Sequence, residues 1–136
     1  MKKTALIVAG LLTTMSCIAA SQDATEILNA SGVQGGLVVV IGCNSPELLA
    51  RLHAGGSYVV HGLDRDLEKV AAAREYLLEK KLYGSVTVSQ WEGTHLPFVD
   101  GVVNLVVISS KLNVPRDEVL RVLAPNGVAV KLNSAT

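Results

Sequence analysis

The hydrophobic positions of this chain form short apolar runs that alternate with segments of helical spacing. Leu37 to Ile41 is a continuous apolar run, and residues 102–108 form a second one, interrupted only by Asn104. Such runs are typical of strands that are buried on both faces, as in parallel sheets. Residues 57–63, 85–89 and 128–132 are predicted as further strands, and the shorter, alternating segment 85–89 is expected near a sheet edge.

Helices are expected between these strands. Asp23 to Glu26 has the form of an N-terminal capping box, which predicts a short helix ending at residues 31–32. Ser45 and Pro46 suit the N-cap and the first position of a helix that ends at residues 55–56. A third short helix is expected over residues 115–123, followed by a turn at 124–127 and the last strand.

The segment from Asp66 to Leu82 carries the clearest helical pattern. Five apolar positions are predicted to share its buried face: Leu67, Val70, Ala71, Leu77 and Leu78. Strands and helices thus alternate along the chain, which predicts an α/β fold with a doubly wound parallel sheet of about five strands in the order 3-2-1-4-5.

The first twenty residues have the pattern of an export signal. Lys2 and Lys3 precede an uncharged, mostly apolar stretch, and small residues lead up to Ala20. We therefore expect a signal peptide over 1–20, a mature domain over 21–136, and an exported (periplasmic or secreted) protein without stable membrane insertion after cleavage. The alternatives are an uncleaved N-terminal anchor helix and, less favoured because Thr14 replaces the usual Leu, a lipoprotein modified at Cys17.

Composition narrows the classes of function. Among 136 residues, twelve basic side chains balance twelve acidic ones, so nothing favours a nucleic-acid partner or an anionic membrane surface. Cleavage at Ala20 would leave Cys43 as the only cysteine, so no internal disulfide is expected. The three histidines, His53, His61 and His95, lack the spacing of metal ligands, and no metal site is predicted.

Candidate chemistry lies where the first predicted strand of the domain ends. In a doubly wound sheet a ligand binds beyond the carboxyl ends of the strands. Gly42 permits the tight turn and close backbone approach needed there, and Asn44 tolerates a left-handed conformation. Asp64 lies 22 residues after Gly42, where an acid accepts hydrogen bonds from ribose hydroxyls. Alternatively, Asp64 serves the N-terminus of the next helix, a role that Asp66 could also fill.

Four segments in order resemble the class I, Rossmann-like methyltransferases that use S-adenosylmethionine. VVVIGCNSPELLARL (38–52) is similar to their glycine-rich first motif, and VHGLDRDLEKVAAAREYL (60–77) to their second strand and helix. VTVSQWEGTHLPFVDGVVNLVVIS (86–109) resembles the stretch with an acid near the adenine, and RVLAPNGVAV (121–130) resembles the run before the fifth strand. The resemblance implies S-adenosylmethionine as cofactor, contacted by Gly42, Cys43, Asn44, Asp64, Arg65, Trp91 and Glu92. Trp91 could stack on the adenine or be a packing residue.

This sequence also departs from the pattern of that family. Val40 replaces an acid in the first strand, Asn44 and Pro46 replace glycines, and Asn104 replaces an acid in the fourth strand. The family's sixth and seventh strands are absent, so the sheet is expected to be truncated, with its fifth strand as an open edge. A protein partner or a second copy could pair there.

Two classes of function remain open. The first is a degenerate methyltransferase-like domain, to which no catalytic residue is assigned. The second is a non-catalytic structural or interaction module, because an exported protein would lack a donor made in the cytoplasm. A signal peptide followed by such a domain also resembles the front of large exported proteins whose later part is a β-propeller of the pyrroloquinoline-quinone type.

Overall fold

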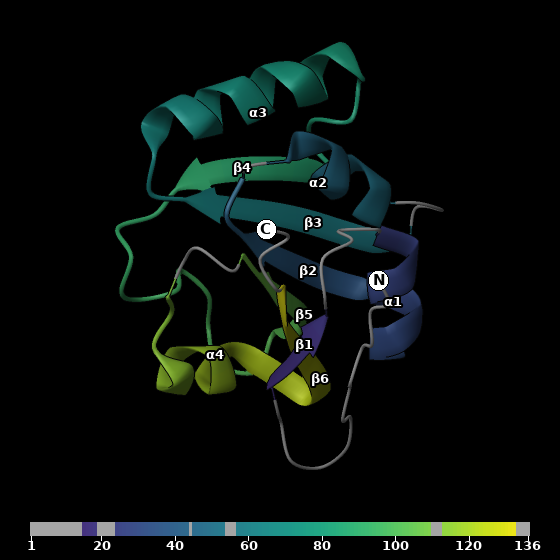
Figure 1. Cartoon of the computed structure of the whole chain (residues 1–136), viewed down its shortest axis with the longest axis vertical. Helices are drawn as coiled ribbons and strands as arrows, with labels where there is room; N and C mark the ends of the chain where they lie inside the picture. The colour runs from purple at the N-terminus through teal and green to yellow at the C-terminus, as the bar shows by residue number, and fades with distance from the viewer. Residues whose placement is uncertain (1–14, 19–23, 44, 54–56, 110–112, 133–136) are drawn as a thin grey trace.

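The computed structural model describes residues 15–18, 24–43, 45–53, 57–109 and 113–132, and side chains within this part except those of residues 15–18, 25 and 26. Six strands form one sheet in the order β1-β6-β5-β2-β3-β4 (Figure 1). They are β1 (Met15–Ile18), β2 (Gly36–Ile41), β3 (Tyr58–Asp64), β4 (Val86–Gln90), β5 (Val103–Ile108) and β6 (Leu123–Leu132). Every neighbouring pair is parallel. The order β4-β3-β2-β5-β6 confirms the predicted 3-2-1-4-5 arrangement, with β4 at an edge.

Helices cover both faces of this sheet. On one face lie α1 (Ala24–Ser31), α2 (Pro46–Leu52) and α3 (Leu67–Glu79), and on the other lies α4 (Arg116–Val122). Successive residues of β2 serve opposite faces, since Val38 and Val40 pack with the first three helices while Val39 and Ile41 pack in the cluster that includes α4. Burial on both faces explains why the strands read as uninterrupted apolar runs. None of the helices in the described segments is long and apolar enough to cross a membrane.

The strand β1 is the main difference from the sequence-based expectation. Met15–Ile18 pairs in parallel with Ala129–Leu132 of β6, so the edge expected to be open is covered in this chain. The β1 segment lies inside the predicted signal peptide, which was not expected to contribute to the fold. Cleavage of the signal peptide remains a prediction. Cleavage at Ala20 would remove β1 and leave the edge of β6 unpaired.

The buried face of α3 is also corrected. Val70, Ala73 and Leu77 are fully buried, whereas Leu67 and Leu78 are 58% and 62% exposed, and Ala71 is exposed as well. A helix on a sheet buries only a narrow stripe, and the stripe chosen here has i, i+3, i+7 spacing. The five apolar positions of the prediction spread over a wider arc than the sheet can cover.

The connection from α4 into β6 contains a register shift. Val103 pairs with Leu123, but Leu105 pairs with Val128, so the predicted turn at 124–127 is accommodated as an irregularity between two paired parts of β6. Asn126 has a left-handed φ of 68° within it. The last strand therefore begins at Leu123 rather than at Val128, the predicted start.

Candidate functional site

The candidate site lies at the carboxyl ends of β2, β3 and β4. Ile41 pairs with Leu63, and Asp64 pairs with Gln90, so the residues that follow these strands meet at one edge of the sheet. Gly42 has a φ of +110°, a conformation that L side chains rarely adopt, and its N–H donates to the Leu63 carbonyl at 2.7 Å. The predicted turn after β2 is therefore present, and it requires glycine.

Asp64 is the buried acid of this edge, with 4% of its surface exposed. Its Oδ2 accepts a hydrogen bond from the Cys43 N–H at 2.7 Å, and its Oδ1 accepts one from the Asp66 N–H at 2.9 Å. The N-cap of α3 is Asp66, whose side chain accepts from the Glu68 N–H. Asp64 consequently does not cap the helix; its carboxylate ties the loop after β2 to the loop after β3.

Cys43 points its thiol into the core beside Gly62. Burial, followed by the nearby Asp64 carboxylate, raises the pKa of the Cys43 thiol to about 12. The sulfur is therefore protonated at neutral pH and is not a nucleophile there. Cys43 contributes to this edge through its backbone N–H, which donates to Asp64.

Trp91 is 4% exposed and packs in the core cluster that also contains Leu63 and Leu96. Its backbone N–H donates to the Asp64 carbonyl at 2.9 Å, and its indole Nε1–H donates to the His95 carbonyl at 2.8 Å. Of the two roles considered for Trp91, this geometry is that of a packing residue which also satisfies its polar atom.

Glu92 follows Trp91 and is exposed. Its carboxylate accepts hydrogen bonds from the Thr94 hydroxyl and from the His95 N–H, the latter at 3.0 Å. These bonds, the Thr94 hydroxyl first, lower the pKa of Glu92 below its usual value. Glu92 thus closes the turn 92–95 and remains an anion at the site edge.

Arg65 is exposed at the same edge. Its carbonyl accepts from the Gln90 side-chain amide at 3.1 Å, and its guanidinium lies so close to Gly93 that a Cβ there would meet Nε at 3.0 Å. Within the described segments it forms no ion pair. Asn44, the remaining predicted contact, lies outside the described residues, and Pro46 occupies the first turn of α2 as predicted.

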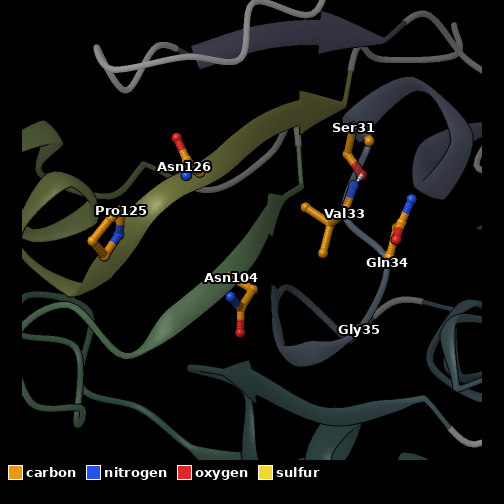
Figure 2. Close-up of a pocket in the computed structure, with 8 residues that line it drawn as sticks. Ser31, Val33, Gln34, Gly35, Asn104, Pro125 and Asn126 are labelled. Carbon is orange, nitrogen blue, oxygen red and sulfur yellow. Dashed lines mark hydrogen bonds between the residues drawn. The ribbon is translucent and has the colours of Figure 1, made fainter.

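Two adjoining cavities lie at the opposite, amino edge of the sheet. The larger, about 570 Å³, is formed by the loop after α1 and by the irregularity in β6, with Asn104 between them (Figure 2). Asn104 Oδ1 accepts from the Leu37 N–H at 3.0 Å, so the residue that replaces the family's acid joins β5 to β2. Across the described segments, no three His, Cys, Asp or Glu side chains are grouped as metal ligands.

A hydrogen-bonded pair on α4 was not singled out from the sequence. Arg121 and Glu118 bind each other and the connection between β4 and β5. Their i, i+3 spacing could have revealed that they interact, but no local pattern reveals which distant backbone atoms they bind.

Comparisons with known proteins identify relatives that share this fold. A family model described as a methyltransferase domain matches residues 38–127. A protein of Methanococcus maripaludis assigned as an S-adenosyl-L-methionine-dependent methyltransferase superposes with a TM-score of 0.69 and 20% identity, covering 82% of this chain and 54% of its own. A SAM-dependent methyltransferase from Aquifex aeolicus gives 0.65 and 23%, covering 79% of this chain and 62% of its own.

A geranyl diphosphate methyltransferase solved in complex with SAM gives a TM-score of 0.66 and 20% identity, covering 76% of this chain and 45% of its own. This chain therefore spans between about half and three fifths of the length of the first two relatives. A search of curated proteins found no match.

The family model covers most of the domain, and its limits enclose the edge built by Gly42, Asp64 and Trp91, so this chain belongs to the methyltransferase domain family.

Proposed function

We propose that this protein is an exported, degenerate methyltransferase-like domain whose carboxyl edge binds S-adenosylmethionine or S-adenosylhomocysteine. The observation that carries the proposal is the Asp64 carboxylate, which bonds to the backbone of both loops that frame the edge. The bond between the Cys43 N–H and Asp64 is present even though Asn44 and Pro46 stand where the family has glycines. Binding, rather than methyl transfer, is the property we propose to be retained.

The residues present fit the adenosine part of such a ligand. The left-handed Gly42 lets a ligand approach the backbone closely. Each Asp64 oxygen accepts one N–H and keeps a second lone pair for a ribose hydroxyl. Because Asp64 is 4% exposed, the ligand must displace part of the surrounding edge to reach it. Arg65 and Glu92 supply exposed polar groups beside it. The Cys43 N–H already donates to Asp64, so its part in the site is to orient that carboxylate, and Asn44, the remaining proposed contact, lies outside the described residues.

S-adenosylmethionine, when bound, supplies an activated methyl group. Transfer of that group depends mainly on positioning, so the lack of an evident acid–base pair does not exclude it. We assign no catalytic residue, because the four departures at Val40, Asn44, Pro46 and Asn104 fall on the motifs that the family uses.

Calorimetry tests the proposal. Titration with S-adenosylhomocysteine and S-adenosylmethionine at about millimolar ligand should show saturable binding to the full chain. Asp64→Ala should abolish it in protein that circular dichroism shows to be folded, and Asp64→Asn should weaken it. Asp117→Asn, an exposed acid on α4, is the matched control and should bind like the parent. No heat from the parent would refute the proposal.

A second function is favoured by the β1–β6 pairing. We propose that the edge of β6 is a strand acceptor, which export would uncover by removing residues 1–20 and which a protein partner or a second copy then covers. The domain would then serve as an interaction module, such as the front piece of a larger propeller protein.

Replacing Ser16 and Cys17 together by Pro removes the N–H that faces β6, whichever of these adjacent residues carries it, while keeping the full chain. We expect the double-Pro protein to self-associate in light scattering, while the Ser16→Ala, Cys17→Ala control stays monomeric. Equal masses for the two proteins would contradict the strand-acceptor role.

A further inference from the structure

Arg121 of α4 uses every N–H of its guanidinium within the fold. Nε donates to Glu118 Oε2 at 3.0 Å and Nη2 donates to Glu118 Oε1 at 2.8 Å. Nη2 also donates to the Leu96 carbonyl at 3.0 Å, while Nη1 donates to the Phe98 carbonyl at 2.9 Å and to Asp100 Oδ1 at 2.8 Å. A guanidinium has five N–H donors, and all five of Arg121 form hydrogen bonds within the protein.

Glu118 adds a further bond to the same segment. Its Oε1 accepts from the Leu96 N–H at 2.8 Å, so both polar backbone atoms of Leu96 are held by this pair. The Glu118 side chain is 15% exposed and that of Arg121 is 32% exposed, which sets the pair apart from an ordinary surface ion pair. The backbone of α4 continues the contact, because Gly101 N–H donates to the Arg121 carbonyl at 2.9 Å.

The held segment leads directly to the candidate site. Leu96 packs in the same core cluster as Trp91, and the Trp91 indole binds the His95 carbonyl next to it. The backbone of Trp91 in turn donates to Asp64. A fixed Leu96 therefore restrains the turn 92–95, and with it the backbone positions of Trp91 and Glu92 at the carboxyl edge.

We propose that Arg121 and Glu118 are positioning residues for the ligand-binding edge: they hold the β4–β5 connection so that Trp91 and Glu92 are preorganised before a ligand arrives. The proposal rests on the proposed cofactor function. Holding a loop in its bound conformation in advance lowers the entropy that binding would otherwise cost. Neither side chain contacts the ligand; both act through Leu96 and the turn that follows Trp91.

Trp91 is the only tryptophan of the chain, so its fluorescence reports on this segment alone. We compare the parent with Arg121→Met, Arg121→Lys and Glu118→Gln. The matched control is Arg116→Met, which removes an exposed arginine from the same helix. The readouts are acrylamide quenching of Trp91 at a temperature where each protein is folded, and the S-adenosylhomocysteine affinity.

We expect Arg121→Met to increase the quenching of Trp91 and to weaken binding by about tenfold, a size in keeping with small displacements of positioning groups. Arg121→Lys keeps the charge without the planar fork and should show a smaller change in the same direction. Arg116→Met should match the parent. If Arg121→Met does not fold, the Arg121→Lys and Glu118→Gln proteins decide the question.

Folded Arg121 and Glu118 variants with parental quenching would overturn the positioning role, even if their melting temperatures fall. The quenching measurement needs no ligand. If the parent fails to bind S-adenosylhomocysteine, the proposed cofactor function is refuted and the quenching comparison still decides whether the pair positions Trp91.

Discussion

The backbone N–H of Cys43 donates a 2.7 Å hydrogen bond to Oδ2 of Asp64, and this contact joins the loops that follow β2 and β3. The two residues are 21 positions apart in the sequence, and both are buried. Asp64 therefore holds the two loops together in addition to being a candidate ligand contact. Loss of Asp64 should therefore affect both stability and binding.

Asp64→Ala should destabilise the protein by about 1.5–3 kcal/mol, because a hydrogen bond from the buried Cys43 N–H to a charged acceptor is lost. Asp64→Asn keeps one oxygen as acceptor and should lose less. Urea unfolding of the three proteins measures the difference. An Asp64→Ala protein as stable as the parent would show that the contact contributes nothing.

Cys43 should be almost unreactive in the folded protein. The sequence has two cysteines, so Cys17→Ser leaves Cys43 as the single thiol. Its pKa of about 12, against an ordinary value of 9.0, lowers the thiolate fraction at pH 8 by roughly a thousandfold. Alkylation with iodoacetamide should proceed at the free-thiol rate only after unfolding in urea. Free-thiol kinetics without denaturant would contradict the burial of Cys43.

Gly36→Ala should lower the free energy of unfolding by more than the strain of a positive φ alone would. Gly36 has a φ of +109°, and a Cβ there would lie 2.1 Å from Asn104 Oδ1. Gly84 has a similar φ of +122° but no atom within 4 Å of the added carbon, so Gly84→Ala measures the conformational strain, about 1–3 kcal/mol. Unfolding midpoints should place Gly36→Ala well below Gly84→Ala. Equal losses would mean that Asn104 moves away without cost.

The Arg121–Glu118 pair should make the free energy of unfolding depend on pH. The hydrogen bond from Arg121, followed by the Leu96 N–H, lowers the pKa of Glu118 to about 2 from 4.5. A carboxyl whose pKa is depressed by folding contributes its full stability above the unfolded pKa and loses it as pH falls toward the folded value. The contribution should therefore be complete above about pH 5 and decline between about pH 4.5 and pH 2.

Urea unfolding at a series of pH values measures this effect. His95 and Asp100 also act on the pair, so the Glu118→Gln protein is the reference for their titration and for that of all other groups. The parent should lose more stability than Glu118→Gln as the pH falls through this window. Parallel curves for the two proteins would contradict the lowered pKa.

The sheet order could be predicted from the sequence because apolar runs, glycine turns and helix starts are local signals. Gly42 and Pro46 lie where their backbone chemistry requires, and β4 is at an edge as its short alternating pattern indicated. The buried stripe of α3 was less predictable, since Leu67 and Leu78 are as apolar as Leu77, and only packing against the sheet decides among them.

The details of the site depend on contacts between distant segments. Whether Asp64 would point outward or bind the Cys43 N–H is decided by how closely two loops approach, and no local pattern records that distance. The same holds for Trp91, whose burial follows from its neighbours Leu63 and Leu96. The pairing of Met15–Ile18 with β6 was missed because an export signal and a short apolar strand have similar composition.

Backbone amide NMR during a titration with S-adenosylhomocysteine shows which edge of the sheet binds the ligand. If the carboxyl edge binds the ligand, the amide signals of Gly42, Arg65 and Glu92 should shift together and saturate with one affinity. Signals of Gln34, Gly35 and Asn126, which line the cavity at the opposite edge, should stay in place. No shift at about millimolar ligand, or shifts confined to the opposite edge, would contradict the account.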